Sequence, residues 1–322
     1  MTLAVDDPTA TSSRIAARTF VIGARGGRLS LAQADFVSQA LRTAAPTIRV
    51  ELRVIETDGD RDRTAPLSEI GGQGVFTKAI ENALCARTID IAVHSLKDLP
   101  TQLADGLAIA AVPPRADARD ALITRDGSTL RSLPRNARIG TSSSRRAHQL
   151  RLLRPDIVPV EIRGNVDTRI RKLRDGEYDG LLLALAGLQR LGASSVASQI
   201  LTIEEMIPAV GQGALAVEVR ADDEAALELA SALDHRRTRL AVEAERAWLA
   251  ELGAGCQWPV GAHASIEGDR LQMVGVMFRG GKPFRDSAVG LAADAQAIGR
   301  RLAQTLTSQA EIVEADPERR PA

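Results

Sequence analysis

The sequence predicts an α/β protein with two α/β lobes, a cleft between them and a smaller C-terminal domain of the α+β class. Short apolar runs alternate with amphipathic runs through most of the chain, which is typical of strands followed by helices and predicts sheets with parallel strands. Two proline-containing bends, at Pro113-Pro114 and at Pro208, interrupt this alternation, and it restarts after the first of them. Beyond residue 236 the apolar runs follow one another directly, which favours antiparallel strands.

The first lobe is predicted to follow a disordered tail, residues 1–18, that is rich in Thr, Ser, Asp and Pro. It covers residues 19–113 and also residues 214–232, because the apolar run at 215–219 is expected to return to its sheet. Its sequence patterns predict strands at 20–24, 50–55 and 89–93 and helices at 29–44 and 75–86.

The second lobe is predicted to span residues 117–207, and the C-terminal domain residues 236–322. In the second lobe we expect strands at 121–124, 138–140, 158–162 and 180–184 and helices at 142–153 and 166–174. In the C-terminal domain we expect helices at 238–252 and 293–309 and strands at 262–266 and 271–278.

Composition excludes several classes of function. Of the 322 residues, 44% are hydrophobic and only 2% aromatic, so the core is aliphatic and few rings are available to stack nucleobases. The 41 basic residues balance 41 acidic ones, so no overall basic field attracts nucleic acid or a membrane. The longest apolar stretch, 180–188, is too short to cross a bilayer. With a polar N-terminus, only two cysteines and no heptads, a reduced, cytoplasmic monomer is expected.

Polar residues that suit an anionic ligand follow the predicted strands. In open α/β sheets, ligands bind beyond the carboxyl ends of strands, where loops lead into helices. The hydroxyl-bearing and charged residues of these loops include Arg25, Ser95, Lys97, Asp98, Thr141, Ser143, Arg145, Arg146, Arg163 and Arg169. Guanidinium groups pair bidentately with carboxylates and phosphates, so the ligand is expected to carry several such groups.

The pair Arg145-Arg146 stands at a hydroxyl-rich helix start, where positive charge opposes the helix dipole unless an anion joins it. We interpret that conflict as a sign of function. The clusters Arg171–Arg174 and His235–Arg237 are better interpreted as solvated helix faces.

Two further residues are candidates for chemistry. Asp98, beside Lys97 at a strand end, could form a surface ion pair with it, or could stabilise a developing cation and move a proton. Cys256 lies in a glycine-rich loop and is a candidate nucleophile, although no His stands next to it. Cys85 fits a helix core, and no C-x-x-C motif indicates a metal site.

Five segments in register closely resemble the porphobilinogen deaminase (hydroxymethylbilane synthase) family of tetrapyrrole biosynthesis. They are HSLKD at 94–98, GTSSSRR at 140–146, RGNV at 163–166, PAVGQG at 208–213 and GCQWPVG at 255–261. The resemblance runs from about residue 20 into the C-terminal domain. It implies a three-domain fold whose two lobes are like periplasmic binding proteins.

The resemblance also implies an activity, a cofactor and a substrate. The family joins four porphobilinogen molecules head to tail with loss of ammonia, on a dipyrromethane cofactor held by a cysteine thioether. It makes Cys256 the anchor of dipyrromethane and Asp98 the catalytic carboxylate. By match to the family, the cofactor and substrate sites are lined by Arg25, Ser95, Lys97, Thr141, Ser143, Arg145, Arg146, Arg163 and Arg169, with weaker matches at Arg190 and Gln212.

Two positions depart from the family pattern. Gly27 stands where many members carry Ser, and Gln73 stands where some carry Lys. Each change removes one contact to a ligand carboxylate, so backbone N–H groups are expected to take over on that side of the site.

Two alternative functions fit part of the pattern. A non-catalytic two-lobed binding protein for a small polycarboxylate would explain the arginine-rich loops but not Cys256. An enzyme that forms a Schiff base through Lys97 would need that lysine desolvated and unpaired, whereas Asp98 is adjacent.

Overall fold

The computed structural model describes residues 18–56, 77–254 and 258–315. These residues form two compact units, one with the described residues up to Pro114 together with Leu215–Arg236, the other with Arg115–Ala214 together with the described residues from Arg237 on. The chain therefore leaves the first unit after Pro114, returns to it at Leu215 and leaves it again after Arg236. The boundaries of three separate domains remain a prediction.

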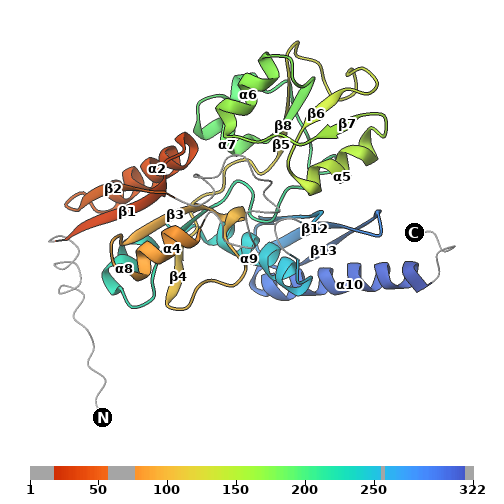
Figure 1. The fold of residues 1–322 in the computed structure, drawn as a ribbon. Helices are drawn as coiled ribbons and strands as arrows, with labels where there is room; N and C mark the ends of the chain where they lie inside the picture. The colour runs from red at the N-terminus through yellow and green to blue at the C-terminus, as the bar shows by residue number, and fades with distance from the viewer. Residues whose placement is uncertain (1–17, 57–76, 255–257, 316–322) are drawn as a thin grey trace. The chain divides into compact units, whose positions relative to one another are not determined.

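The first unit contains a five-stranded mixed sheet in the order β2-β1-β3-β10-β4. Figure 1 labels strands β1, β2, β3 and β4 of this sheet. Its elements are β1 (Thr19–Arg25), α2 (Arg28–Ala44), β2 (Arg49–Ile55), α4 (Lys78–Cys85), β3 (Ile91–Ser95), the 3-10 helix η1 (Leu96–Asp98), β4 (Leu107–Ala111), β10 (Leu215–Arg220) and α8 (Glu224–Ser231). The predicted return of the chain to this sheet is confirmed, because β10 pairs with both β3 and β4. One face of the sheet packs against α2 and α8 in a core that includes Phe20, Ile22 and Val37.

The second unit contains a sheet in the order β7-β6-β8-β5-β9. Its elements are β5 (Asp120–Thr124), β6 (Arg138–Gly140), α5 (Ser144–Leu153), β7 (Val158–Val160), α6 (Val166–Arg174), β8 (Gly180–Ala184), α7 (Leu185–Arg190), the 3-10 helix η2 (Ser194–Val196) and β9 (Gln199–Ile200). Strands β6, β7 and β8 run parallel, so their carboxyl ends meet at one edge. This edge carries the polar loops predicted from the sequence.

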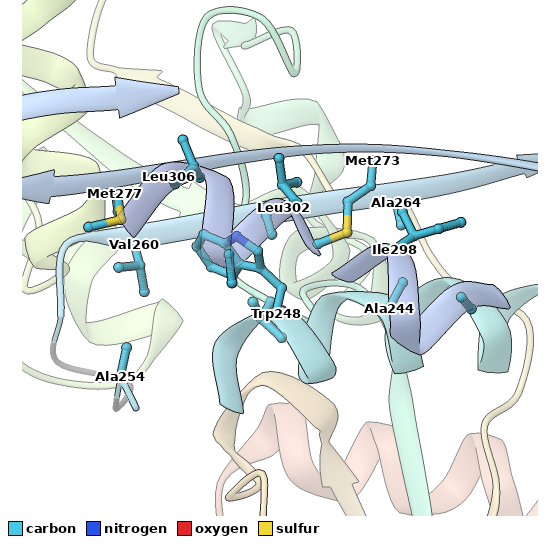
Figure 2. Packing of buried hydrophobic residues seen from close by; sticks show 14 of the residues in the cluster. Ala244, Trp248, Ala254, Val260, Ala264, Met273, Met277, Ile298, Leu302 and Leu306 are labelled. Atoms are coloured by element: carbon cyan, nitrogen blue, oxygen red, sulfur yellow. The ribbon is translucent and has the colours of Figure 1, made fainter. Parts of the chain in front are cut away.

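The same unit also contains a three-stranded antiparallel sheet in the order β11-β12-β13. Its elements are α9 (Arg236–Glu251), β11 (Val260–Glu267), β12 (Arg270–Arg279), β13 (Lys282–Leu291), the 3-10 helix η3 (Ala292–Asp294) and α10 (Ala295–Ala315). Figure 2 shows the indole of Trp248 among side chains of the sheet and of α10, including Met277 and Leu302. A Cβ at Gly275 would lie 3.1 Å from that indole, closer than ordinary van der Waals contact, so the indole packs tightly against this glycine.

The structure corrects the sequence analysis in three respects. The strands of the first two sheets are not all parallel, because β10 runs antiparallel to its neighbours and β5 runs antiparallel to β8. The helices α7 and α8 and the strands β4, β9 and β13 were not predicted. The interpretation of Cys85 as a core residue is wrong: it is exposed, because α4 buries Ile80 and Leu84, and Cys85 lies about 100° further round the helix than Leu84.

Candidate functional site

In the first unit, the predicted site residues lie at the carboxyl ends of two adjacent parallel strands. Arg25 ends β1 and Ser95 ends β3, and these strands pair in parallel at Ile22–Ile91. Arg25 and Ser95 therefore lie at the same edge of the sheet, as predicted. Lys97 and Asp98 follow directly in the turn of 3-10 helix η1, where the Asp98 side chain is exposed and able to meet a ligand.

A hydrogen bond from α2 holds the end of β3. Buried Gln33 donates from its Nε2 to the Ser95 Oγ, at 2.9 Å. At the start of α2, Gly27 is the N-cap residue and makes no side-chain capping bond, and the first turn of the helix carries no acidic residue. The absence of a carboxylate in that turn leaves the helix N-terminus without a fixed counter-charge of its own.

In the second unit, the predicted hydroxyls organise the start of α5. The Ser143 backbone N–H donates to Thr141 Oγ1 at 3.2 Å, and the Ser143 Oγ caps the helix by accepting from the Arg146 backbone N–H at 3.4 Å. The loop after β7 is shaped in the same way, because Asn165 caps α6 by accepting from the Thr168 N–H at 2.9 Å. Two capped helix N-termini therefore begin beyond two adjacent parallel strands.

Arg145 and Arg146 are both buried, and the anion that joins them is Asp120 of β5. Asp120 accepts from Arg145 Nη1 at 2.8 Å and from Arg146 Nη2 at 2.6 Å and Nε at 3.0 Å. Burial alone would raise the pKa of Asp120, but the two guanidinium groups outweigh it and lower that pKa. One carboxylate balances only one of two cations, so the pair retains a net positive charge.

Arg163 and Arg169 extend this positive charge along the loop after β7 and into α6. The Arg163 Nη1 is buried and has no hydrogen-bond partner among the described residues. Arg169 donates from Nε to the Gly164 carbonyl at 2.8 Å. Burial, together with the nearby charges of Arg146 and Arg163, lowers the pKa of Arg169 to about 10. The depressed pKa marks a site where cations are crowded and an added anion would be stabilising.

Arg190 and Gln212, the weaker matches, also belong to the second unit. Arg190 donates to the Gly213 carbonyl at 2.6 Å, and burial lowers its pKa to about 10. Gln212 donates from Nε2 to Asp120 Oδ1 at 2.9 Å and to the Ala118 carbonyl at 2.7 Å. Gln212 therefore helps to fix the carboxylate that holds the two arginines.

The second unit fits a polycarboxylate cofactor such as dipyrromethane. Besides Arg163 Nη1, the buried Arg145 Nε lacks a partner within the described residues, so two guanidinium groups each have an N–H for which these residues supply no acceptor. The predicted anchor, Cys256, lies outside the described residues, as does Gln73. Among the described residues there is no group of His, Cys, Asp and Glu that could bind a metal ion, and no helix with the length and hydrophobicity that a membrane span needs.

Sequence reasoning did not identify Asp120, Gln33 or Glu218 as part of the surroundings of the site. Asp120 and Glu218 are fully buried acids inside strands whose other residues are almost all apolar. An acidic residue in such a strand is the signal that could have identified them, because a buried charge needs a partner.

Comparisons of the sequence with known proteins identify one family. Residues 20–228 match the family model described as porphobilinogen deaminase, dipyromethane cofactor binding domain, and residues 239–308 match the porphobilinogen deaminase C-terminal domain. A porphobilinogen deaminase of Roseiflexus sp. (strain RS-1) is 49% identical over 293 residues, which are 91% of this chain and 97% of the relative. The porphobilinogen deaminase of Syntrophobacter fumaroxidans is 45% identical over 291 residues, 90% of this chain and 94% of the relative.

Among solved structures, a double mutant of the VFT2 domain of Bordetella pertussis BvgS is similar with a TM-score of 0.42 and 10% identity. The alignment covers 71% of this chain and 92% of that domain.

Proposed function

This chain belongs to the porphobilinogen deaminase family, and we propose that it joins four porphobilinogen molecules head to tail into the linear tetrapyrrole hydroxymethylbilane. In each condensation the aminomethyl C–N bond of one pyrrole breaks and ammonia leaves. The methylene carbon then bonds to the unsubstituted α-carbon of the next pyrrole, which loses its proton. In the release step water takes the place of a pyrrole nucleophile: the carbon–carbon bond that tethers the tetrapyrrole breaks, its methylene carbon gains the hydroxyl group, and the ring carbon that it leaves gains the proton.

Asp98 is the catalytic carboxylate in this proposal. Loss of ammonia leaves a cation that is delocalised onto the pyrrole nitrogen, and attack by the next ring again places positive charge on nitrogen. An ionised carboxylate stabilises both cations and accepts a proton from them. The position of Asp98 supports this role, because its exposed side chain follows the strand β3 in a turn held from α2 through Ser95.

The arginine residues bind the acetate and propionate side chains of the pyrrole rings. The observation that carries this proposal is the excess of buried positive charge in the second unit, where Asp120 is the carboxylate that contacts Arg145 and Arg146, and Arg163 keeps an unpartnered buried N–H. A ligand that bears several carboxylates supplies the acceptors that are missing. Arg25, Ser95 and Lys97 are proposed to bind the same class of ligand in the first unit, with Thr141 and Ser143 shaping the loop in the second.

Dipyrromethane, bound through a thioether to Cys256, supplies the pyrrole primer to which the substrate units are added. The chain's contribution is to hold the carboxylates of that primer with Arg145, Arg146, Arg163 and Arg169. Because Cys256 is the residue proposed to form the covalent bond, its sulfur is the atom to test first.

Intact-mass measurement tests the anchor. We expect the purified protein to exceed the mass of the bare polypeptide by one dipyrromethane, and Cys256→Ala to lose that difference, whereas Cys85→Ala, the matched control, keeps it. A wild-type protein that makes hydroxymethylbilane without any adduct would overturn the anchor role of Cys256.

A turnover assay tests the reaction and the role of Asp98. Asp98→Asn keeps the size of the side chain but loses its charge, so we expect an almost complete loss of ammonia release with the thermal unfolding midpoint preserved. Wild-type rates in this variant would refute the assignment of Asp98. A wild-type protein that binds porphobilinogen but releases no ammonia would instead favour a non-catalytic binding protein.

The predicted cytoplasmic monomer is tested separately. Sedimentation of the purified protein and fractionation of the cells that make it would decide the oligomeric state and the compartment.

A further inference from the structure

The two residues that precede the turn of Asp98 are each held by a side-chain hydrogen bond. Successive side chains of a strand point to opposite faces of the sheet, so His94 and Ser95 of β3 face different layers. Ser95 accepts from Gln33 of α2. On the other face, His94 Nε2 lies 2.9 Å from Glu218 Oε2 of β10. The end of β3 is therefore held from both sides of the sheet.

The contact between His94 and Glu218 is a diagonal pair across two antiparallel strands. His94 lies directly opposite Ala216, and Glu218 lies opposite Ala92, so the two side chains share one face of the sheet. Both side chains are almost wholly removed from solvent, with 3% of His94 and none of Glu218 exposed. A pair so deeply buried keeps one geometry, because neither side chain has room for another rotamer.

Backbone pairing alone leaves the end of β3 less constrained. The pairing of β3 with β1 covers only Ile91 and Ala92, whereas β10 pairs as far as Ser95. Beyond Ala92, β10 is thus the neighbouring strand that determines where β3 ends. The side chain of Glu218, on β10, contacts His94 near the end of β3. This contact adds to the backbone pairing of the two strands just before the turn of Asp98.

Stability does not account for this pair. Burial of two ionisable groups costs desolvation energy, and a well-packed apolar pair of similar size is often as stable or more stable. Glu218 carries an additional cost, because its Oε1 is buried without a hydrogen-bond partner among the described residues. The neighbouring cluster on this face consists of apolar side chains, including Ile80 and Leu84. A costly polar pair in such surroundings, next to the turn of Asp98, points to a role in the site.

We propose that His94 and Glu218 are positioning residues, which fix the end of β3 so that Asp98 meets the reacting pyrrole nitrogens. The proposal rests on the function proposed for Asp98. The pair acts through geometry: the length of the Glu218 side chain sets the position in which the His94 side chain is held, two residues before the turn of Asp98 begins. Misplacement of a catalytic group by about 1 Å can cost on the order of 100-fold in rate.

Two single substitutions of Glu218 separate the effect of side-chain length on kcat from the effect of side-chain charge. Glu218→Gln keeps the length and an oxygen that accepts from His94, so we expect a kcat within about threefold of wild type. Glu218→Asp keeps the charge but is one methylene shorter, so we expect kcat to fall at least about tenfold with KM unchanged. The reverse order, with a slow Gln variant and a wild-type Asp variant, would overturn the proposal.

A double substitution separates a role of the pair in positioning Asp98 from a role in the stability of the fold. His94→Leu combined with Glu218→Leu replaces the pair by apolar side chains, and we expect an unfolding midpoint close to wild type, an intact cofactor mass and a kcat reduced by about 100-fold. Wild-type kcat in this folded variant would contradict the proposal. If the double variant does not fold, the contrast between Glu218→Gln and Glu218→Asp still decides.

Two further variants complete the experiment. Asp222→Asn, which breaks the exposed pair with Arg87 in the same unit, is the control and is expected to leave kcat unchanged. Asp98→Asn is measured in parallel. If it is inactive while the Glu218→Asp variant and the double variant have wild-type kcat, only the positioning proposal fails. If Asp98→Asn is active, the proposed function of Asp98 fails.

Discussion

Arg115 and Glu245 form a two-point ion pair, with Arg115 Nη1 2.6 Å from Glu245 Oε1 and Nη2 3.1 Å from Oε2. Glu245 is fully buried in α9 and also accepts from the backbone N–H groups of Gly211, at 2.7 Å, and Ala264, at 2.8 Å. Arg115 directly follows the Pro113-Pro114 bend, and Gly211 lies in the 208–213 bend. One carboxylate therefore fastens α9 to segments next to two of the points where the chain passes from one unit to the other.

The first prediction concerns the stability of this arrangement. Glu245→Ala leaves the half-buried guanidinium of Arg115 and two backbone N–H groups without this acceptor, so we expect the free energy of unfolding to fall by about 3–5 kcal/mol. Urea denaturation measures the change. Glu251→Ala, at an exposed position of the same helix, is expected to change it by less than about 0.5 kcal/mol. Equal effects of the two substitutions would show that the burial of Glu245 is not what matters.

The second prediction concerns ligand binding by Arg163. Arg163→Ala removes a guanidinium whose buried Nη1 has no partner in the described part of the chain, so we expect kcat/KM to fall about 10–100-fold. Steady-state kinetics with porphobilinogen measures the change. Arg171→Ala, at an exposed position on α6, serves as the control and is expected to retain wild-type kinetics. A normal kcat/KM for Arg163→Ala would remove this residue from the site.

The third prediction concerns Gly213 in the second bend. Its φ is +88°, and a Cβ there would lie 2.5 Å from the Ala116 carbonyl oxygen. Gly213→Ala combines a left-handed backbone with a clash against the main chain, so we expect a loss of about 2–4 kcal/mol in unfolding free energy. Gly192→Ala, with a φ of +65° and open space around the added methyl group, is expected to lose only about 1 kcal/mol. Similar losses at both positions would rule out the clash as the cause.

The fourth prediction concerns acid stability through Asp223. Burial alone would raise its pKa, but hydrogen bonds from Arg18, the Ala226 N–H and Arg220 hold that pKa at about 2, below the ordinary 3.8. A carboxyl group whose pKa is lower in the folded state contributes stability above about pH 4 and loses it as the pH falls toward 2.

Denaturation of wild type and Asp223→Asn at pH 7 and pH 3 measures this contribution. Between pH 7 and pH 3, the free energy of unfolding of wild type should fall by on the order of 1 kcal/mol more than that of the variant, after allowance for the partial exposure of Arg18. Asp222→Asn, at an exposed pair, should behave like wild type. If the free energy of unfolding falls equally in wild type and in Asp223→Asn, Asp223 is not the cause of the loss of stability in acid.

Much of the local structure could be predicted from the sequence, because it depends on neighbouring residues. The helix at 166–174 and the strands at 138–140 and 180–184 lie where hydrophobic periodicity and flanking glycines indicated. Strand direction could not be read in this way. That β10 is antiparallel to β3 depends on the path of the chain through the second unit, and periodicity along one strand carries no information about its neighbour.

The candidate site was only partly predictable for a related reason. The arginine and hydroxyl loops were found because each follows its own strand. The partner of Arg145 and Arg146 was not found, because Asp120 is separated from Arg145 by 25 residues. Asp120 lies in β5, whereas the two arginines follow β6. The same holds for His94 and Glu218, which are 124 residues apart. Such contacts form only when the sheet is assembled.

The position of β10 in the first sheet has a consequence for synthesis of the chain. This strand lies between β3 and β4 yet is translated after every strand of the second sheet, which lie between residues 120 and 200. During translation the second sheet can therefore close while β3 and β4 still lack their shared neighbour. A nascent chain that stalls before residue 215 would expose two open strand edges to other chains, and we expect it to depend on chaperones until β10 emerges from the ribosome.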